Sequence, residues 1–300
     1  MRRYLLPDEV NTTGFTGVPG PSEKTGPGPS GHSGYFDPSG PGSFSEVKVR
    51  GEEFHYLIHV LRYEKGSRFE GIDRRGFLYN LEITEVTPNS LTLHLQPKSP
   101  DDGTSGDDGN RPTFYLYQAL LKGKKMDSVI RQAAATGIHH IIPLVTEHTV
   151  AKIETTQREE KKLARWNSVI KEALQQSGST VITQLHSTEQ LQNLKKSRFS
   201  STLGLFFHEK PLENGSLHRY LSSCPQRIAL FIGPEGGLSA AEVELLHGIG
   251  CRPVQLQTNI LRSETAAVYA IGAVQSIAGE INQWKHVPQF QEATDTAEYQ

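Results

Sequence analysis

Hydrophobic positions follow two different periods in the two halves of the chain. Up to residue 97, apolar residues alternate with polar ones in short runs, which predicts strands at about 2–6, 46–50, 67–71, 76–86 and 90–96. Between them, Phe54, Leu57, Ile58 and Leu61 have helical spacing and predict one helix over 52–61. Short strands with a single helix indicate a small β-barrel.

From Thr113 onward, strand patterns alternate with helical ones. Strands are expected at 113–119, 138–145, 203–208, 227–233 and 254–256, and long helices at 125–136, 157–176 and 263–283. A shorter helix should begin after Ser239, because Ser239 and Glu242 have the spacing of a capping box. This alternation is typical of a mostly parallel sheet covered by helices. The side chains of the last helix are small and apolar along most of its length, which suits packing in the interior or against a second subunit.

Three segments lack these patterns. Residues 11–43 consist mainly of Gly, Pro, Ser and Thr, and we interpret them as a disordered insertion. Residues 98–111 are rich in Asp and Gly and are interpreted as a linker, and 289–300 as a disordered tail. The predicted domains are therefore 1–97 and 112–288.

Composition excludes several classes of protein. The 300 residues carry a formal net charge of −2, which argues against a protein that coats nucleic acid indiscriminately. No segment is long and apolar enough to span a bilayer, and Pro7 ends the first apolar run too early for a signal peptide, so we expect a cytoplasmic protein without membrane contact. The 2 cysteines, Cys224 and Cys251, allow at most one disulfide, and buried free thiols are the favoured interpretation.

Two loops of the second domain are candidates for a ligand site. Gly233-Pro234-Glu235-Gly236-Gly237 follows a strand, and its glycines allow the backbone to approach a ligand closely. It lacks the Lys and Ser/Thr of a phosphate-binding P-loop and the spacing of a dinucleotide motif. The loop from Leu256 to Leu261 repeats the arrangement and leads into a helix through Ser263. We predict that the two loops leave neighbouring strands and form the walls of one cleft, although each alone is also compatible with an ordinary strand-to-helix turn.

Two other groups of polar residues, a pair of histidines and a cluster of lysines, indicate a function less clearly than the two loops do. His55 and His59 have the i, i+4 spacing of a shared metal site, but no third ligand is recognisable, and we predict no metal. Lys122, Lys124 and Lys125 form a basic cluster. Such a cluster is either a surface for RNA or a solvated helix face.

The two loops also carry a family resemblance. Ile232 to Ser239 (IGPEGGLS), followed by Ile260 to Ala266 (ILRSETA), resembles the ribosomal RNA small subunit methyltransferase E family of the SPOUT superfamily. Supporting segments are 123–127 (GKKMD), 176–178 (QSG) and 59–62 (HVLR). The resemblance implies an α/β protein with an N-terminal PUA-like β-barrel for RNA binding and a C-terminal trefoil-knotted SPOUT methyltransferase domain. It further implies a homodimer that uses S-adenosylmethionine (SAM) to methylate N3 of a uridine in 16S rRNA, within the 30S subunit.

The chemistry of the implied reaction suggests roles for individual residues. Arg262 is expected to stabilise the negative charge that develops on the uridine, and Glu264 either acts as a general base, caps the last helix or pairs with Arg262. RNA contacts are expected from Arg2, Arg3, Arg62, Lys122, Lys124 and Lys125. The residues expected to hold the cofactor are Phe207, His208, Gly233, Pro234, Glu235, Gly236, Gly237, Leu256, Thr258, Asn259, Ile260 and Leu261.

The chain departs from the family pattern at three positions. Ser179 stands where an Arg is usual, and Gln132 and Ala135 stand where a Lys and a Glu are usual. These changes affect expected RNA contacts more than the cofactor loops. Two alternatives remain open. A ribose 2′-O-methyltransferase of the same superfamily would share the cleft, and the missing Arg after Gly178 leaves room for a non-catalytic RNA-binding factor of ribosome assembly.

Overall fold

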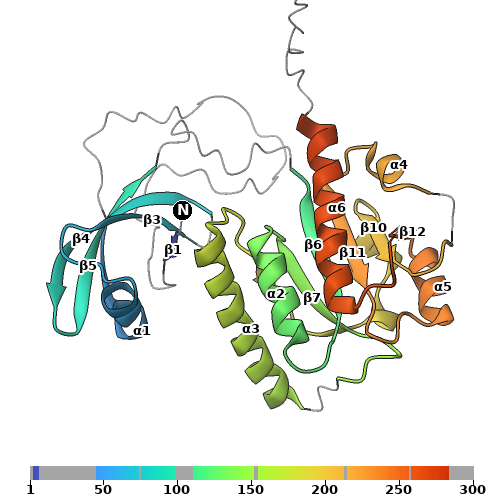
Figure 1. Cartoon of the computed structure of the whole chain (residues 1–300), viewed down its shortest axis with the longest axis horizontal. Coiled ribbons are helices and arrows are strands. Elements are labelled where there is room, and N and C mark those ends of the chain that lie inside the picture. Colours follow the sequence, from blue (N-terminus) through green and yellow to red (C-terminus); the bar gives the residue numbers. More distant parts are fainter. Residues whose placement is uncertain are drawn as a thin grey trace, which may run out of the picture. The chain divides into compact units, whose positions relative to one another are not determined.

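The computed structural model describes residues 3–6, 45–73, 76–98, 111–151, 155–212, 215–256 and 258–283. Arg2, the 11–43 insertion, most of the linker and the tail fall outside this part of the chain. Two compact units are present (Figure 1): Met1–Ser105 with Leu174–Ile182, and Gly106–Ala173 with Thr183–Gln300. The sequence did not predict that 174–182 belongs to the first unit.

The first unit is built on one five-stranded sheet. Its strands are β1 (Tyr4–Leu5), β2 (Ser45–Arg50), β3 (Arg68–Ile72), β4 (Leu78–Thr87) and β5 (Ser90–Pro97), in the order β1-β3-β4-β5-β2. β1 runs parallel to β3, and the other pairs are antiparallel. The predicted helix is α1 (Gly51–His55), continued by the π-helical turn η2 (Tyr56–Val60). Alternate strand residues such as Leu81 and Leu93 are fully buried and pack with Leu57 of η2 in one core, as the period of two predicts.

A parallel sheet forms the centre of the second unit. It contains β6 (Thr113–Ala119), β7 (His140–Val145), β8 (Gln184–Leu185), β10 (Leu203–Phe207), β11 (Arg227–Ile232) and β12 (Arg252–Val254), with β9 (Glu189–Gln190) paired to β7. The order is β12-β10-β11-β6-β7-β8, and every pairing is parallel. One prediction was wrong: β11 and β12 are not neighbours, because β10 lies between them. The carboxyl ends of three strands, rather than two, therefore meet where a ligand is expected.

Helices cover both faces of this sheet. α6 (Ser263–Gln283) packs against α2 (Lys125–Ala135), α4 (Leu217–Leu221) and β11, and Figure 1 shows α2 and α6 side by side. The face predicted for α2 is buried and consists of Met126, Val129, Ile130 and Ala133. The opposite face of the sheet packs with α5 (Ala240–Gly248), η3 (Leu191–Asn193) and η4 (Lys196–Phe199) in a second core.

The remaining helix, α3 (Thr156–Ser177), is fixed to α2 by a buried carboxylate. Asp127 accepts a hydrogen bond from the Trp166 indole at 3.1 Å and forms an ion pair with Arg165. None of the helices within the described part of the chain has the length and hydropathy needed to cross a bilayer.

Candidate functional site

A cleft of about 570 Å³ lies at the carboxyl ends of β10, β11 and β12. Three segments line it: the end of β10, the Gly-rich loop after β11, and the loop that runs from β12 into α6. Every residue expected to hold the cofactor is among its lining residues, as are Lys125, Arg262 and Ser263. The cofactor contacts themselves stay a prediction, but the structure brings these residues together in one place.

The Gly-rich wall has the conformation that its sequence requires. Gly237 has φ +73°, in the left-handed region that favours glycine. A Cβ added to Gly236 would lie 3.0 Å from the Cβ of His148, so the loop packs closely against that residue. The capping box at the start of α5 is confirmed: Ser239 Oγ accepts from the Glu242 amide at 3.3 Å, and Glu242 Oε2 accepts from the Ser239 amide at 2.9 Å.

A buried hydrogen-bond relay connects the two main walls. Gln118, at the end of β6, donates from Nε2 to Ser263 Oγ at 3.2 Å, and Ser263 donates to the Gly233 carbonyl at 2.5 Å. Gln118 is fully buried and Ser263 is 6% exposed. The relay fixes the start of α6 against Gly233, the first residue of the Gly-rich loop. Arg262 lies directly before this helix and Glu264 in its first turn. Sequence reasoning missed it, and the only signal was a polar residue at the end of an apolar strand.

Arg262 and Glu264 sit on either side of Ser263. The Arg262 side chain is exposed and lines the cleft, while its carbonyl accepts from the amides of Thr265 and Ala266 and begins α6. Glu264 occupies the first turn of α6, and its side chain is 21% exposed. Its Oε2 atom is buried and has no hydrogen-bond partner among the residues that the structure describes.

Lys125 also belongs to this site. Its Nζ atom lies 3.1 Å from Glu235 Oε1 and 3.7 Å from Glu264 Oε2, so one ammonium bridges a carboxylate from each wall. Burial alone would raise the pKa of Glu235, but hydrogen bonds from its own amide, from Lys125 and from the Lys122 amide outweigh burial and lower that pKa. The sequence grouped Lys125 with Lys122 and Lys124 as an RNA contact and gave no sign of these carboxylates.

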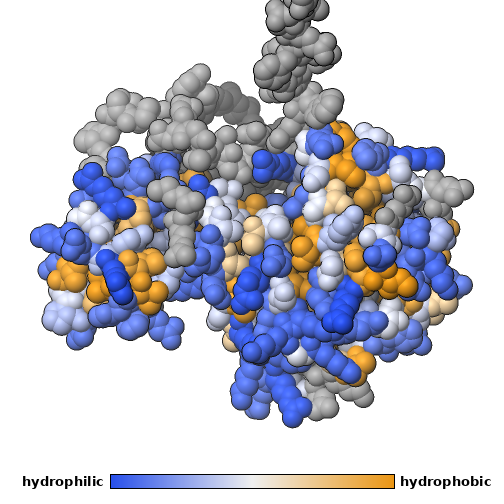
Figure 2. Space-filling view, in the orientation of Figure 1, coloured by the Kyte–Doolittle hydropathy of each residue, from blue (hydrophilic) through white to orange (hydrophobic). Residues whose placement is uncertain are grey.

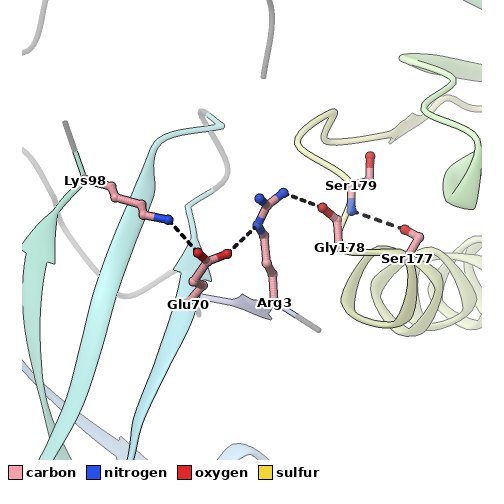
Figure 3. A network of polar contacts seen from close by, with 6 residues as sticks. All are labelled: Arg3, Glu70, Lys98, Ser177, Gly178 and Ser179. Atoms are coloured by element: carbon pink, nitrogen blue, oxygen red, sulfur yellow. Dashed lines mark hydrogen bonds and ion pairs between the residues drawn. The ribbon is translucent and has the colours of Figure 1, made fainter. Parts of the chain in front are cut away.

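The residues expected to contact RNA differ in their surroundings. Arg62, Lys122 and Lys124 are exposed. Arg3 is 11% exposed: its guanidinium pairs with Glu70 at 3.0 Å and donates to the Gly178 carbonyl (Figure 3). Lys98 holds the other oxygen of Glu70 at 2.5 Å. The Arg3 side chain is thus engaged within the first unit, and an RNA contact by it stays a prediction.

The positions of the histidine and cysteine side chains bear on metal binding. Among the described residues, no three His, Cys, Asp or Glu side chains lie close enough to hold an ion. His55 and His59 are exposed, with ring centroids 4.8 Å apart. Both cysteines are free, as predicted, but Cys224 is exposed and only Cys251 is buried. The expectation of a buried thiol was therefore wrong for Cys224, which follows the end of the short helix α4.

Comparisons with known proteins agree with this arrangement of domains. A family model described as an RNA methyltransferase domain matches residues 109–275, and one described as an RNA methyltransferase PUA domain matches 49–96. A relative from Rickettsia conorii named ribosomal RNA small subunit methyltransferase E is 30% identical over 225 residues, 73% of this chain and 85% of that protein. The relative of the same name from Bacillus subtilis is 28% identical over 234 residues, 75% of this chain and 88% of that protein.

Solved structures give the same result for the fold. Lpg2936 from Legionella pneumophila, in complex with bound SAM, is 26% identical with a TM-score of 0.64 over 77% of this chain and 92% of that one. A ribosomal RNA small subunit methyltransferase E from Neisseria gonorrhoeae, bound to S-adenosyl methionine, is 21% identical and shows the fold alone, with a TM-score of 0.64 over 80% and 95% of the two chains. The predicted fold class, a PUA-like domain followed by a SPOUT α/β methyltransferase domain, is confirmed. With the matched domains and the similarity to these relatives, the chain belongs to the ribosomal RNA small subunit methyltransferase E family.

Proposed function

We propose that this protein uses SAM to methylate N3 of a uridine in 16S rRNA, within the 30S subunit. The observation that carries the proposal is the cleft in which both family loops, the end of β10 and Arg262 come together. Its volume of about 570 Å³ is within the range of about 300–1,000 Å³ that is common for sites of small molecules.

The walls of the cleft fit SAM better than they fit a phosphorylated cofactor. Gly233, Gly236 and Gly237 leave backbone groups accessible, and apolar side chains such as Leu256 and Ile260 line the other wall. Backbone amides and carbonyls there would hold the adenine and ribose, and no phosphate has to be neutralised. Glu235 and Glu264 place carboxylates at the site, and carboxylates are compatible with the positive sulfonium of SAM.

In the proposed reaction, bound SAM would supply a methyl group from a positively charged sulfur, which would become a neutral thioether. The residues of this chain have to remove the N3 proton and stabilise the resulting charge. Glu264 accepts the proton as the N3–H bond breaks, and the electron pair left on N3 forms the new bond to the methyl carbon. Arg262 stabilises the charge that spreads onto the two uracil carbonyl oxygens, a contribution of about 3–4 kcal/mol for one preorganised donor in comparable sites.

We also propose that the protein forms a homodimer through α6. Val268, Tyr269 and Ile281 of this helix are 37%, 51% and 36% exposed. Figure 2 shows hydrophobic surface where α6 lies in Figure 1. Exposed apolar side chains on a helix favour association with another protein surface. Sedimentation velocity at micromolar concentration should give a dimer, and a strictly monomeric protein would contradict this part.

The proposed function is tested with labelled SAM and two substrates, 30S subunits and protein-free 16S rRNA. We expect calorimetry to show SAM binding and the label to enter 16S rRNA in the 30S subunit. Failure to bind SAM would favour a non-catalytic assembly factor. Label on a ribose oxygen would instead favour the 2′-O-methyltransferase.

A further inference from the structure

Lys125 is held by the cleft instead of extending into solvent. It is the first residue of α2, and its side chain is 36% exposed. The ammonium donates a hydrogen bond to Glu235 Oε1 at 3.1 Å and lies 3.7 Å from Glu264 Oε2. Glu235 belongs to the Gly-rich wall and Glu264 to the start of α6. The Lys125 ammonium therefore bridges the two walls.

The same contacts make a phosphate contact by Lys125 costly. If its ammonium left for an RNA phosphate, Glu235 and Glu264 would lose the cation between them. The Oε2 atom of Glu264 is buried and accepts no hydrogen bond in the described part of the chain, and a buried carboxylate oxygen without a nearby opposite charge is unfavourable. Lys122 and Lys124, in contrast, are exposed. The three lysines are close in sequence, but only Lys125 among them is paired with the two carboxylates of the cleft, whereas Lys122 and Lys124 are exposed and can reach a phosphate.

Glu264 is buried at one carboxylate oxygen and partly exposed elsewhere. The Lys125 ammonium lies 3.7 Å from the buried Oε2 atom, too far for a hydrogen bond, so it stabilises the carboxylate electrostatically. The side chain as a whole is 21% exposed, which leaves part of it open to a substrate. Among the described residues, the charged and titratable side chains that line the cleft are Lys125, His208, Glu209, Glu235 and Arg262, and Glu264 adjoins them through its contact with Lys125.

We propose that Lys125 is a positioning residue of the catalytic cleft, whose ammonium bridges Glu235 and Glu264 and holds the Glu264 carboxylate ready to accept the N3 proton. This inference rests on the proposed function, because it assigns Glu264 as the base of that reaction. It replaces the RNA contact that the sequence predicted for Lys125.

The test compares Lys125→Met, which keeps the length of the side chain but removes the charge, with Lys125→Arg, which keeps the charge. Lys124→Met is the matched variant of an exposed neighbour. For Lys125→Met we expect kcat for methyl transfer to fall at least tenfold, with the KM for RNA within twofold of wild type. Lys125→Arg should recover part of kcat. Lys124→Met should change the KM and leave kcat within twofold.

Two further measurements do not depend on turnover. In a titration of RNA affinity against salt, Lys124→Met should reduce the slope of log K against log[salt] by about one, and Lys125→Met should leave it unchanged. In a carbon-13 NMR titration, Lys125→Met should raise the pKa of Glu235, because that ammonium is one of the groups that lower it. Lys124→Met should not change this pKa.

These measurements separate the inference from the proposed function. If Lys125→Met weakens RNA binding, reduces the salt slope and keeps kcat, Lys125 is an RNA contact and the inference is wrong. If the Glu235 pKa is the same in wild type and Lys125→Met, the bridge does not exist in solution and the inference is also wrong. If the wild type transfers no methyl group to RNA, the proposed function fails, and so does the role of Lys125 in proton removal. The salt slope and the Glu235 titration still decide where the ammonium lies.

Discussion

Replacing Ser263 with Ala removes the centre of the relay that connects the walls of the cleft. The hydroxyl donates to the Gly233 carbonyl at 2.5 Å and accepts from Gln118 Nε2 at 3.2 Å. Gln118 Nε2 has two N–H groups, and the one that donates to the Ala119 carbonyl at 3.0 Å is unaffected, so the substitution leaves one Gln118 N–H and the Gly233 carbonyl without their partner. A donor or acceptor left without its partner in a buried site costs about 1–3 kcal/mol. Water can replace part of the bond at the half-buried Gly233 but not at the fully buried Gln118, so we expect a loss of about 2–3 kcal/mol in the free energy of unfolding.

The same substitution should also lower the rate of methyl transfer. Ser263 lies between Arg262 and Glu264, and a shift of this turn misplaces both side chains relative to the Gly-rich loop. A loss of about 1.4 kcal/mol in transition-state stabilisation lowers the rate tenfold, and we expect at least that decrease in kcat. Urea unfolding and methyl-transfer assays measure the two effects, with Ser263→Thr as the control that retains the hydroxyl. If Ser263→Ala unfolds at the wild-type urea concentration with full kcat, the relay has no role in either property.

Three further predictions follow from single residues. Arg262→Ala should abolish turnover and leave SAM affinity within severalfold by calorimetry; a fully active variant would exclude the role given to Arg262. Burial, then the neighbouring His186 and His139, lower the pKa of His140 from 6.5 to about 4, so its proton binds more tightly to the unfolded chain. The contribution of neutral His140 to stability is complete above about pH 6.5 and is lost as the pH falls toward 4. Urea unfolding should therefore show a lower free energy of unfolding at pH 5 than at pH 7.5, and the difference should be smaller in His140→Phe. An equal difference in both proteins would contradict this. Because burial raises the pKa of Cys251 to about 12 and Cys224 is exposed, Ellman's reagent should modify one thiol in the native protein and two after denaturation; two in the native protein would mean that Cys251 is accessible.

Long periodic segments were predictable from the sequence. β6 has the predicted bounds, and α2 and α6 have theirs within a residue, because each buries a continuous apolar face. The capping box at Ser239 was predictable for a local reason, since its donors and acceptors lie three residues apart. Elements such as β8 and α4 are too short to show a period, and tertiary contacts decide their conformation.

Contacts between distant segments were not predictable in this way. Nothing local places β10 between β11 and β12, because strand order depends on how each crossover packs on the sheet. Gln118 and Ser263 are 145 residues apart, and Lys125 and Glu235 are 110 apart. The loops that line the cleft could therefore be identified by their motifs, whereas the relay and the Lys125 bridge became visible only in three dimensions.

The most direct test of the proposed function is the identity of the methylated nucleoside. Purified 30S subunits are incubated with the protein and with SAM that carries a deuterated methyl group, and the 16S rRNA is digested to nucleosides for mass spectrometry. We predict that the label is found in N3-methyluridine with the wild-type protein and is absent with Arg262→Ala. Label in a 2′-O-methylated nucleoside, or no label in RNA, would contradict the proposed function.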